Sequence, residues 1–297
     1  MTIPPPVLAP EGVRAPTAPF ARLGALWIQL TGTWCNLECT HCLNASGPTD
    51  PWLRPLAPAV VHHALAEAER LGVREIYFTG GEPFLHRQIL PLLEASLVVA
   101  PTTVLTNGTA LTVATADALR ALADRARYSL EIRVSLDDVE QARNDRVRGR
   151  GAFSRTVRTL QLLEARGLLP IVAVTEILRE ETTAEGGLYE RFHRFLRSIG
   201  IARPRVKIIP VFAVGRLEGR RAERLTDAAL EGFDRGMLQC AETRVVADGG
   251  VYACPILAGL PGARLSSGSL EAAFRPAPLY HTACVTCHRT GMSCRNF

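Results

Sequence analysis

Short apolar runs alternate with longer amphipathic stretches along the chain from residue 21 onward. The apolar runs have the length and the bounding residues of buried strands, and they fall at 26–31, 75–79, 102–106, 130–136, 171–177 and 205–212. Helical spacing of apolar residues predicts helices at 58–71, 111–125, 153–166 and 188–199. Gly72, Gly167 and Gly200 follow the first, third and fourth of these, at positions where glycine commonly ends a helix.

The repeated order of strand and helix predicts an α/β fold. Each of the six predicted strands is followed by a connecting segment, and such repeats build a parallel sheet with right-handed crossovers. Six units are too few for a closed barrel, which needs eight strands. We therefore expect an open, partial (β/α)6 barrel with parallel strands.

The pattern changes after residue 216. The sequence pattern predicts a charged linker at 218–224 and a short helix at 226–235. A β-hairpin follows, with strands at 243–247 and 251–254 joined by Asp248-Gly249-Gly250. The predicted organisation is a Pro-rich extended arm at 1–20, a partial barrel at 21–216 and a small Cys-rich C-terminal extension at 217–297.

Composition narrows the classes of function. Apolar residues make up 47% of the 297 residues, enough for a buried core. The net charge of +5 comes from arginines intermixed with acids, and aromatics are only 6%, so we expect no nucleic-acid partner. The chain lacks an apolar stretch of about 18 residues and a basic-then-apolar N-terminal region, which predicts no membrane span, no signal peptide and a cytoplasmic location. In that compartment eight cysteines indicate metal binding or catalysis rather than disulfides.

Distinctive short segments follow the first four predicted strands. They are 35–42, 80–83, 106–108 and 135–138. In parallel barrels the chemistry gathers at the carboxyl ends of the strands. The four segments are therefore expected to meet in one site.

Three cysteines, Cys35, Cys39 and Cys42, lie in the first of these segments. Thiolates are soft ligands that suit iron–sulfur clusters or zinc. A four-iron cluster held by three cysteines keeps one iron open for another ligand. Zinc with a distant fourth ligand, or with His41, is the alternative, although zinc sites more often pair cysteines as two C-x2-C units.

The C-x3-C-x2-C spacing after a first strand resembles the radical S-adenosylmethionine (SAM) superfamily, and the resemblance extends over the chain from that strand onward. It implies a catalytic 4Fe–4S cluster on Cys35, Cys39 and Cys42, with SAM bound to the open iron. An electron from the cluster then breaks the sulfur–C5′ bond of SAM, and the 5′-deoxyadenosyl radical takes a hydrogen atom from the substrate. His41 stands where the family often has Tyr or Phe, and its ring can still stack on adenine.

Gly80-Gly81-Glu82-Pro83 resembles the GGEP motif of the same family. Two glycines let the backbone approach a ligand closely, and the Glu82 carboxylate suits an ammonium group. Asn107, after the third strand, is either a polar contact in the same pocket or part of an Asn-Gly turn.

The resemblance assigns further residues to the SAM pocket. Ser135 and Asp137 would bond the ribose hydroxyls, and Arg148 would pair with the cosubstrate carboxylate. A solvated arginine near a helix start is the alternative for Arg148. Glu176 lies among apolar residues of the fifth strand, where a carboxylate is costly unless it is used, so it is a candidate for catalysis whose role stays open.

Five more cysteines lie in the extension. A cysteine on each side of a glycine-turned hairpin, followed by C-x2-C, resembles the auxiliary-cluster extensions called SPASM and twitch. Five cysteines fit one cluster, as in the shorter twitch form, which implies a second 4Fe–4S cluster on Cys240, Cys254, Cys284 and Cys287. Cys294 is then a substitute ligand of this second cluster, a hydrogen donor in catalysis, or a cysteine without a role in the site. A structural zinc site on the same four cysteines is the alternative.

These observations predict a radical SAM enzyme that abstracts a hydrogen atom from a peptide or a small molecule. Its electron would come from a flavodoxin- or ferredoxin-type reductant. The alternative is a non-catalytic iron–sulfur electron carrier or sensor, which would not need Glu82, Ser135 or Arg148 around an open iron. A zinc-stabilised nucleic-acid binder would need a basic face that the sequence does not predict.

Overall fold

The computed structural model describes residues 15–177, 187–219, 223–291 and 294–296. Its strands are β1 (Thr17–Ala18), β2 (Ala25–Gln29), β3 (Glu75–Thr79), β4 (Thr102–Thr106), β5 (Leu130–Ser135), β6 (Ile171–Thr175), β7 (Arg205–Ile209), β8 (Thr243–Ala247), β9 (Gly250–Tyr252), β10 (Arg264–Ser266) and β11 (Ala277–Pro278). Its α-helices are α1 (Pro58–Arg70), α2 (Ile89–Val99), α3 (Val113–Arg125), α4 (Gln141–Arg148), α5 (Ala152–Glu164), α6 (Gly187–Ser198) and α7 (Thr282–Thr290).

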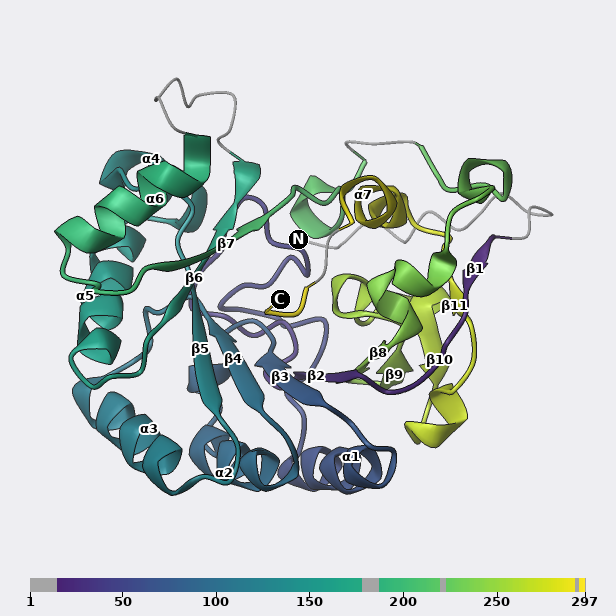
Figure 1. The fold of residues 1–297 in the computed structure, drawn as a ribbon, viewed down its shortest axis with the longest axis horizontal. Helices are drawn as coiled ribbons and strands as arrows, with labels where there is room; N and C mark the ends of the chain where they lie inside the picture. The colour runs from purple at the N-terminus through teal and green to yellow at the C-terminus, as the bar shows by residue number, and fades with distance from the viewer. Residues whose placement is uncertain (1–14, 178–186, 220–222, 292–293, 297) are drawn as a thin grey trace.

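One large sheet forms the centre of the molecule, in the order β10-β9-β8-β2-β3-β4-β5-β6-β7. Strands β2 to β7 are parallel, and the helices between them cover the outer face of the curved sheet (Figure 1). The predicted α/β architecture with a partial barrel of six parallel strands is therefore confirmed. The six strands and the four helices expected in this part are present, with small differences at their ends.

The hairpin of the extension continues the sheet of the barrel. β8 pairs in parallel with β2, from Ala25 opposite Thr243 to Ile28 opposite Val246, and β9 runs antiparallel to β8. The hairpin itself was predicted, but its attachment to β2 was not. Because the first cysteines follow β2, this pairing places the extension beside them.

The helix predicted at 226–235 is wrong. The structure has only short 3-10 turns there, at Ala228–Leu230 and Arg235–Met237. Gly232 lies between them with φ at 72°, a conformation that interrupts a right-handed helix. Residues 1–14 of the predicted arm and 220–222 of the predicted linker lie outside the described residues.

A buried arginine organises the backbone of the extension. The Arg244 side chain is fully buried, its guanidinium carbon lies 3.5 Å from the ring centroid of Phe20, and its nitrogens donate to carbonyl oxygens. The acceptors are the carbonyls of Cys240, Thr243, Ala273 and Arg275. One side chain thereby fixes the turn that carries Cys240 against the segment before β11.

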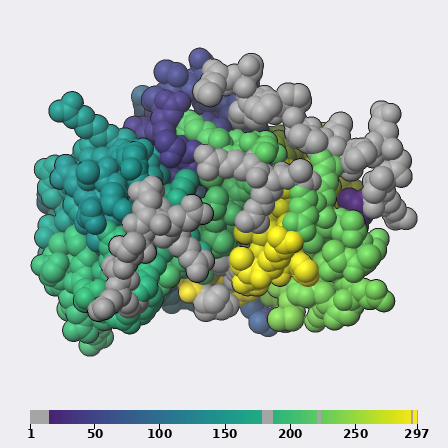
Figure 2. Space-filling model, turned by 90° about the horizontal axis from the view of Figure 1, so that it is seen from above, coloured from purple at the N-terminus to yellow at the C-terminus, as the bar shows by residue number. Residues whose placement is uncertain are grey.

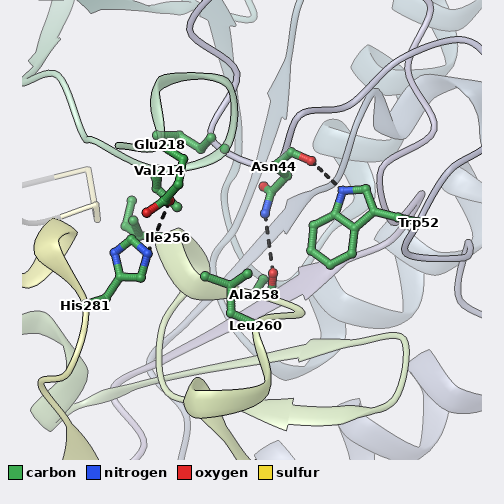
Figure 3. Close-up of a pocket in the computed structure, with 10 residues that line it drawn as sticks. Asn44, Trp52, Val214, Glu218, Ile256, Ala258, Leu260 and His281 are labelled. Carbon is green, nitrogen blue, oxygen red and sulfur yellow. Dashed lines mark hydrogen bonds and ion pairs between the residues drawn. The ribbon is translucent and has the colours of Figure 1, made fainter. Parts of the chain in front are cut away.

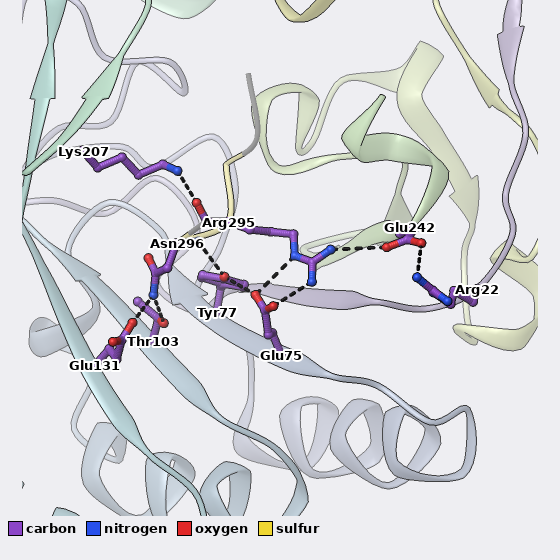
Figure 4. Close-up of polar contacts among 9 residues, drawn as sticks. All are labelled: Arg22, Glu75, Tyr77, Thr103, Glu131, Lys207, Glu242, Arg295 and Asn296. Atoms are coloured by element: carbon purple, nitrogen blue, oxygen red, sulfur yellow. Dashed lines mark hydrogen bonds and ion pairs between the residues drawn. The ribbon is translucent and has the colours of Figure 1, made fainter. Parts of the chain in front are cut away.

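The segment 294–296 lies against the inner face of the barrel (Figure 4). Arg133 of β5 is almost fully buried and donates to the Cys294 carbonyl at 2.8 Å and to Asn296. Arg295 donates to Glu75 of β3 at 2.7 Å. Charged groups that would be costly in the interior of the barrel are thus satisfied by this segment. In Figure 2 the yellow C-terminal residues lie between the teal barrel and the light-green extension.

Replacement of Arg244 with Met should destabilise the protein, because it leaves buried carbonyl oxygens without donors. We expect a loss of about 3 kcal/mol in the free energy of unfolding, measured by chemical denaturation. Arg264→Met, at an exposed position of β10, is the matched control and should change stability little. Equal unfolding midpoints for the two variants would contradict the structural role of Arg244.

Candidate functional site

The three cysteines of the loop after β2 lie near one another. Cys35 is buried, Cys39 and Cys42 are half-buried, and none forms a disulfide. Burial is the main cause that raises the pKa of Cys35 to about 12 and that of Cys39 to about 11, and neighbouring thiols add to both shifts. Without a metal Cys35 and Cys39 are therefore protonated thiols, and a bound metal would replace their protons.

N–H groups of the protein point at two of these sulfur atoms. Leu37 N lies 3.4 Å and Asn107 Nδ2 lies 3.6 Å from Cys35 Sγ. Ser46 N lies 3.2 Å from Cys42 Sγ. Hydrogen bonds to ligating sulfur are one of the means by which proteins set the reduction potential of an iron–sulfur cluster.

The two glycines after β3 approach the chain itself. A Cβ at Gly81 would lie 2.0 Å from the Trp34 carbonyl oxygen and 2.8 Å from Cys35 Cβ. Gly80 has φ at 146°, and a Cβ there would lie 2.3 Å from Thr31 Oγ1. Glycine is therefore required at both positions because the loop after β3 lies directly on the cysteine loop. The close approach of a ligand was the expected reason for these glycines, and this contact within the chain is a further reason.

Glu82 connects the loops that follow β3 and β4. Its side chain is fully buried and accepts hydrogen bonds from Thr106 Oγ1 at 2.7 Å, Asn107 N at 2.7 Å and Phe84 N at 3.1 Å. Burial raises the pKa of Glu82 to about 7, although these hydrogen bonds favour the ionised form. The carboxylate thus lies beside Asn107, which also contacts Cys35.

His41, Asp137 and Arg148 form a buried cluster. Asp137 Oδ2 lies 2.7 Å from Arg148 Nε and 3.2 Å from His41 Nε2. Burial alone would raise the pKa of Asp137, but the charges of Arg148 and His41 hold it below its usual value. The positive charge of Arg148 also acts on Cys39 and Cys42. These three residues were expected to make separate contacts with SAM, whereas the structure brings them together.

Arg216 holds the cysteine loop from the side of the extension. Its guanidinium donates to the carbonyl oxygens of Cys39 and Ser46, each at 2.7 Å, and lies 3.2 Å from Glu38. The preceding Gly215 has φ at 64°, and a Cβ there would lie 2.3 Å from the Leu43 carbonyl oxygen. This contact was not predicted, because nothing in the local sequence pattern shows where the residues after β7 pack.

The other predicted site residues also lie at the carboxyl ends of the strands. Ser135 ends β5, and Asn107 directly follows β4. Glu176 lies one residue beyond β6, half-buried, and not within the strand as predicted. Thr175 N donates to Asp137 Oδ1 at 3.0 Å, which joins the end of β6 to the buried cluster. The expected convergence of the four loops is therefore observed.

The five remaining cysteines gather in the extension. Cys240, Cys254, Cys284 and Cys287 line one hollow, whose other lining residues are mostly apolar. Cys284 and Cys287 are three residues apart on α7 and therefore share one face. Cys294 lies within electrostatic reach of Cys254 and Cys287, and burial raises the pKa of all five thiols.

Comparisons with known proteins agree with this arrangement. The sequence profile of the radical SAM superfamily matches residues 30–190. Mycofactocin maturase MftC of Mycobacterium tuberculosis (strain ATCC 25618 / H37Rv) is 29% identical over 312 residues, covering 94% of this chain and 76% of the relative. GTP 3′,8-cyclase of Mycolicibacterium smegmatis is 34% identical over 145 residues, covering 46% of this chain and 38% of that protein.

Solved structures share the fold at low sequence identity. Streptococcus suis SuiB bound to precursor peptide SuiA has a TM-score of 0.64 and 15% identity, with 87% of this chain and 66% of that chain covered. Native anSMEcpe with bound AdoMet has a TM-score of 0.62 and 16% identity, with 84% and 80% covered.

Because the profile matches more than half of the chain, the protein belongs to the radical SAM superfamily. It is a radical SAM enzyme, and its cofactors are a 4Fe–4S cluster and SAM. The site fits them: it holds three neighbouring thiols, and the buried atoms His41 Nδ1, Thr31 Oγ1 and Ser46 Oγ have no hydrogen-bond partner among the described residues. Within the described ranges, no helix has the length and apolar character that crossing a membrane requires.

The buried Glu82 should make stability depend on pH. Its pKa of about 7 in the folded protein lies above the ordinary value of 4.5, so folding favours the protonated form and ionisation destabilises the fold. Glu82 should therefore lower the free energy of unfolding of the cofactor-free protein by on the order of 3 kcal/mol as the pH rises from about 4.5 to 7. His281, whose pKa burial lowers to about 4, and His41 contribute with the opposite sign, so the contribution of Glu82 is read from the difference between a variant and the wild type.

Glu82→Gln removes this titration, so the free energy of unfolding of the variant relative to that of the wild type should rise over this pH range, measured by urea denaturation. Glu69→Gln, at an exposed position of α1, should keep the slope of the wild type. An unchanged slope in Glu82→Gln would show that Glu82 does not carry the predicted proton.

Loss of the Arg216 contacts should loosen the cysteine loop. In Arg216→Met a chelator should remove iron from the reconstituted protein roughly ten times faster than in the wild type. A change of that size corresponds to the loss of about one charge-assisted hydrogen bond. Arg216→Lys should show a smaller increase, because one ammonium cannot reach all the acceptors. Arg150→Met, at an exposed position, is the control; a release rate in Arg216→Met equal to that of this control would refute the role.

Proposed function

We propose that this radical SAM enzyme modifies a peptide and that its catalytic 4Fe–4S cluster binds to Cys35, Cys39 and Cys42. The observation that carries this assignment is the convergence of three thiols in a loop held by Gly81 and Arg216. Three ligands leave one iron open for SAM. When bound, these cofactors supply a 5′-deoxyadenosyl radical that takes a hydrogen atom from the substrate.

The residues of this chain would bind and orient SAM beside the cysteine loop. Glu82 offers a fixed carboxylate next to Asn107 and Cys35, and each of its oxygens can accept more than one hydrogen bond, which suits the ammonium group of SAM. Ser135 and Asp137 are proposed as contacts for the ribose. The expected pairing of Arg148 with the carboxylate of SAM stays a prediction, and its observed partner is Asp137.

The extension would hold a second, auxiliary 4Fe–4S cluster on Cys240, Cys254, Cys284 and Cys287. These four thiols line one hollow, which supports a common ligand. A cluster in which each iron takes one thiolate suits four such thiols. A structural zinc on the same four thiols is the alternative, and the metal content distinguishes the two.

A peptide substrate is favoured over a small molecule by the relatives. The match to a maturase extends over 94% of this chain, and one solved structure of the same fold is bound to a precursor peptide. The match to the cyclase covers only 46% of the chain. The match to the maturase is long enough to include much of the extension, so this part of the chain also resembles the maturase.

Two matched cysteine variants test the assignment of both clusters. Wild-type protein reconstituted anaerobically should contain about eight irons per chain, and replacement of Cys35, Cys39 and Cys42 with Ala should leave about four. That variant should form no 5′-deoxyadenosine when dithionite and SAM are added.

Replacement of Cys240, Cys254, Cys284 and Cys287 with Ala should also lower the iron content to about four. This variant should still release 5′-deoxyadenosine without peptide modification, because the catalytic cluster is intact. Zinc in place of iron in the extension would refute the auxiliary cluster, and iron without 5′-deoxyadenosine in the wild type would favour an electron carrier or sensor.

A further inference from the structure

A pocket lies between the cysteine loop and the extension (Figure 3). Its walls are mainly apolar and come from Leu43, the ring of Trp52, Val214, Ile256 and Leu260. It contains about 400 Å³ of space when the part open to solvent is included.

Two polar side chains, Glu218 and His281, line the same pocket and contact each other. His281 Nε2 lies 3.4 Å from Glu218 Oε2. His281 Nδ1 accepts a hydrogen bond from Ala283 N at 3.0 Å, so in the neutral ring the proton is on Nε2, facing Glu218. Gly219 N also donates to the Glu218 carboxylate. Glu218 is thus held in place as an acceptor at the edge of an apolar cavity.

The other polar groups of the pocket are bonded within the protein. Trp52 Nε1 donates to the Asn44 carbonyl at 2.8 Å, and Asn44 Nδ2 lies 3.5 Å from the Ala258 carbonyl oxygen. These bonds fix the wall that lies opposite the extension. Glu218, on which the charge of Arg224 also acts, is then the acceptor that a ligand in this pocket would meet.

The pocket lies between the two groups of cysteines. Leu43 directly follows Cys42, and Gly215 packs against the carbonyls of Cys42 and Leu43. Ile256, two residues after Cys254, lines both this pocket and the hollow of the four C-terminal thiols. A group bound here would have the proposed catalytic cluster on one side and the proposed auxiliary cluster on the other.

We propose that this pocket binds one side chain of the substrate, an apolar side chain that carries a hydroxyl or amino group, with Glu218 as the acceptor of its hydrogen bond. The inference rests on the proposed function, because it takes the substrate to be a peptide. The apolar wall contributes affinity by burial, and Glu218 selects a donor over an acceptor, since a carboxylate in the ligand would face the carboxylate of Glu218.

Small probes test the pocket without a known substrate. The anaerobically reconstituted full chain with SAM is titrated with n-butylamine, n-butanol or butyrate, and binding is measured by calorimetry. Butylamine or butanol should bind and butyrate should not, and the stronger of the first two identifies the donor as ammonium or hydroxyl. Equal binding of butyrate would overturn the proposal.

Glu218→Gln keeps the shape of the side chain and removes its charge. It should weaken butylamine about tenfold and butanol less, because the amide oxygen still accepts a hydrogen bond. Glu231→Gln, an exposed residue in the same part of the chain, should bind both probes as the wild type does. Unchanged affinities in Glu218→Gln would also overturn the proposal.

The formation of 5′-deoxyadenosine, measured in the same preparations, separates this inference from the proposed function. If the wild type forms 5′-deoxyadenosine and the probes do not bind, the pocket assignment fails alone. If the wild type forms none, the assignment of the catalytic cluster fails whatever the probes do.

Discussion

The close contact between Gly81 and the backbone of Trp34 and Cys35 is the constraint on which the site depends. No side chain fits between these two loops, so the loop after β3 fixes the position of the loop that carries the first cysteine. The same contact brings Glu82 N to the Trp34 carbonyl at 3.0 Å. The Glu82 side chain then fixes the loop after β4, and Asn107 from that loop returns to Cys35. Three strand ends are thereby joined into one rigid unit.

The extension is built onto this unit. β8 extends the sheet from β2, and Arg216 donates to the Cys39 carbonyl, so the second group of cysteines has a fixed position relative to the first. Arg133 binds the segment that carries Cys294 to the inner face of the barrel. The pocket with Glu218 and His281 results from this attachment, because its walls come from both parts of the chain.

Much of the fold could be predicted because its signals are local. Each strand of the barrel is a short apolar run. Motif residues such as Glu82 and Asp137 lie just after the ends of these strands, so their place in the site could be predicted together with the strands. Helix α2 gave no such signal, because its sequence is apolar around most of its circumference. Contacts between segments far apart in the sequence could not be predicted. Arg216 lies 174 positions after Cys42, and only the folded chain shows that the two residues are in contact. The pairing of Arg148 with Asp137 was also missed, because the resemblance assigned each of these residues to a contact with SAM.

The central claim is that two separate groups of cysteines hold iron–sulfur clusters on opposite sides of the substrate pocket. It is tested most directly by an anaerobic crystal structure of the reconstituted protein with SAM, with anomalous data collected on both sides of the iron and zinc absorption edges. We predict an iron signal bonded to Cys35, Cys39 and Cys42 with SAM beside it, and a second iron signal among Cys240, Cys254, Cys284 and Cys287. A zinc signal among the C-terminal cysteines, or SAM bound away from the first cluster, would contradict the account.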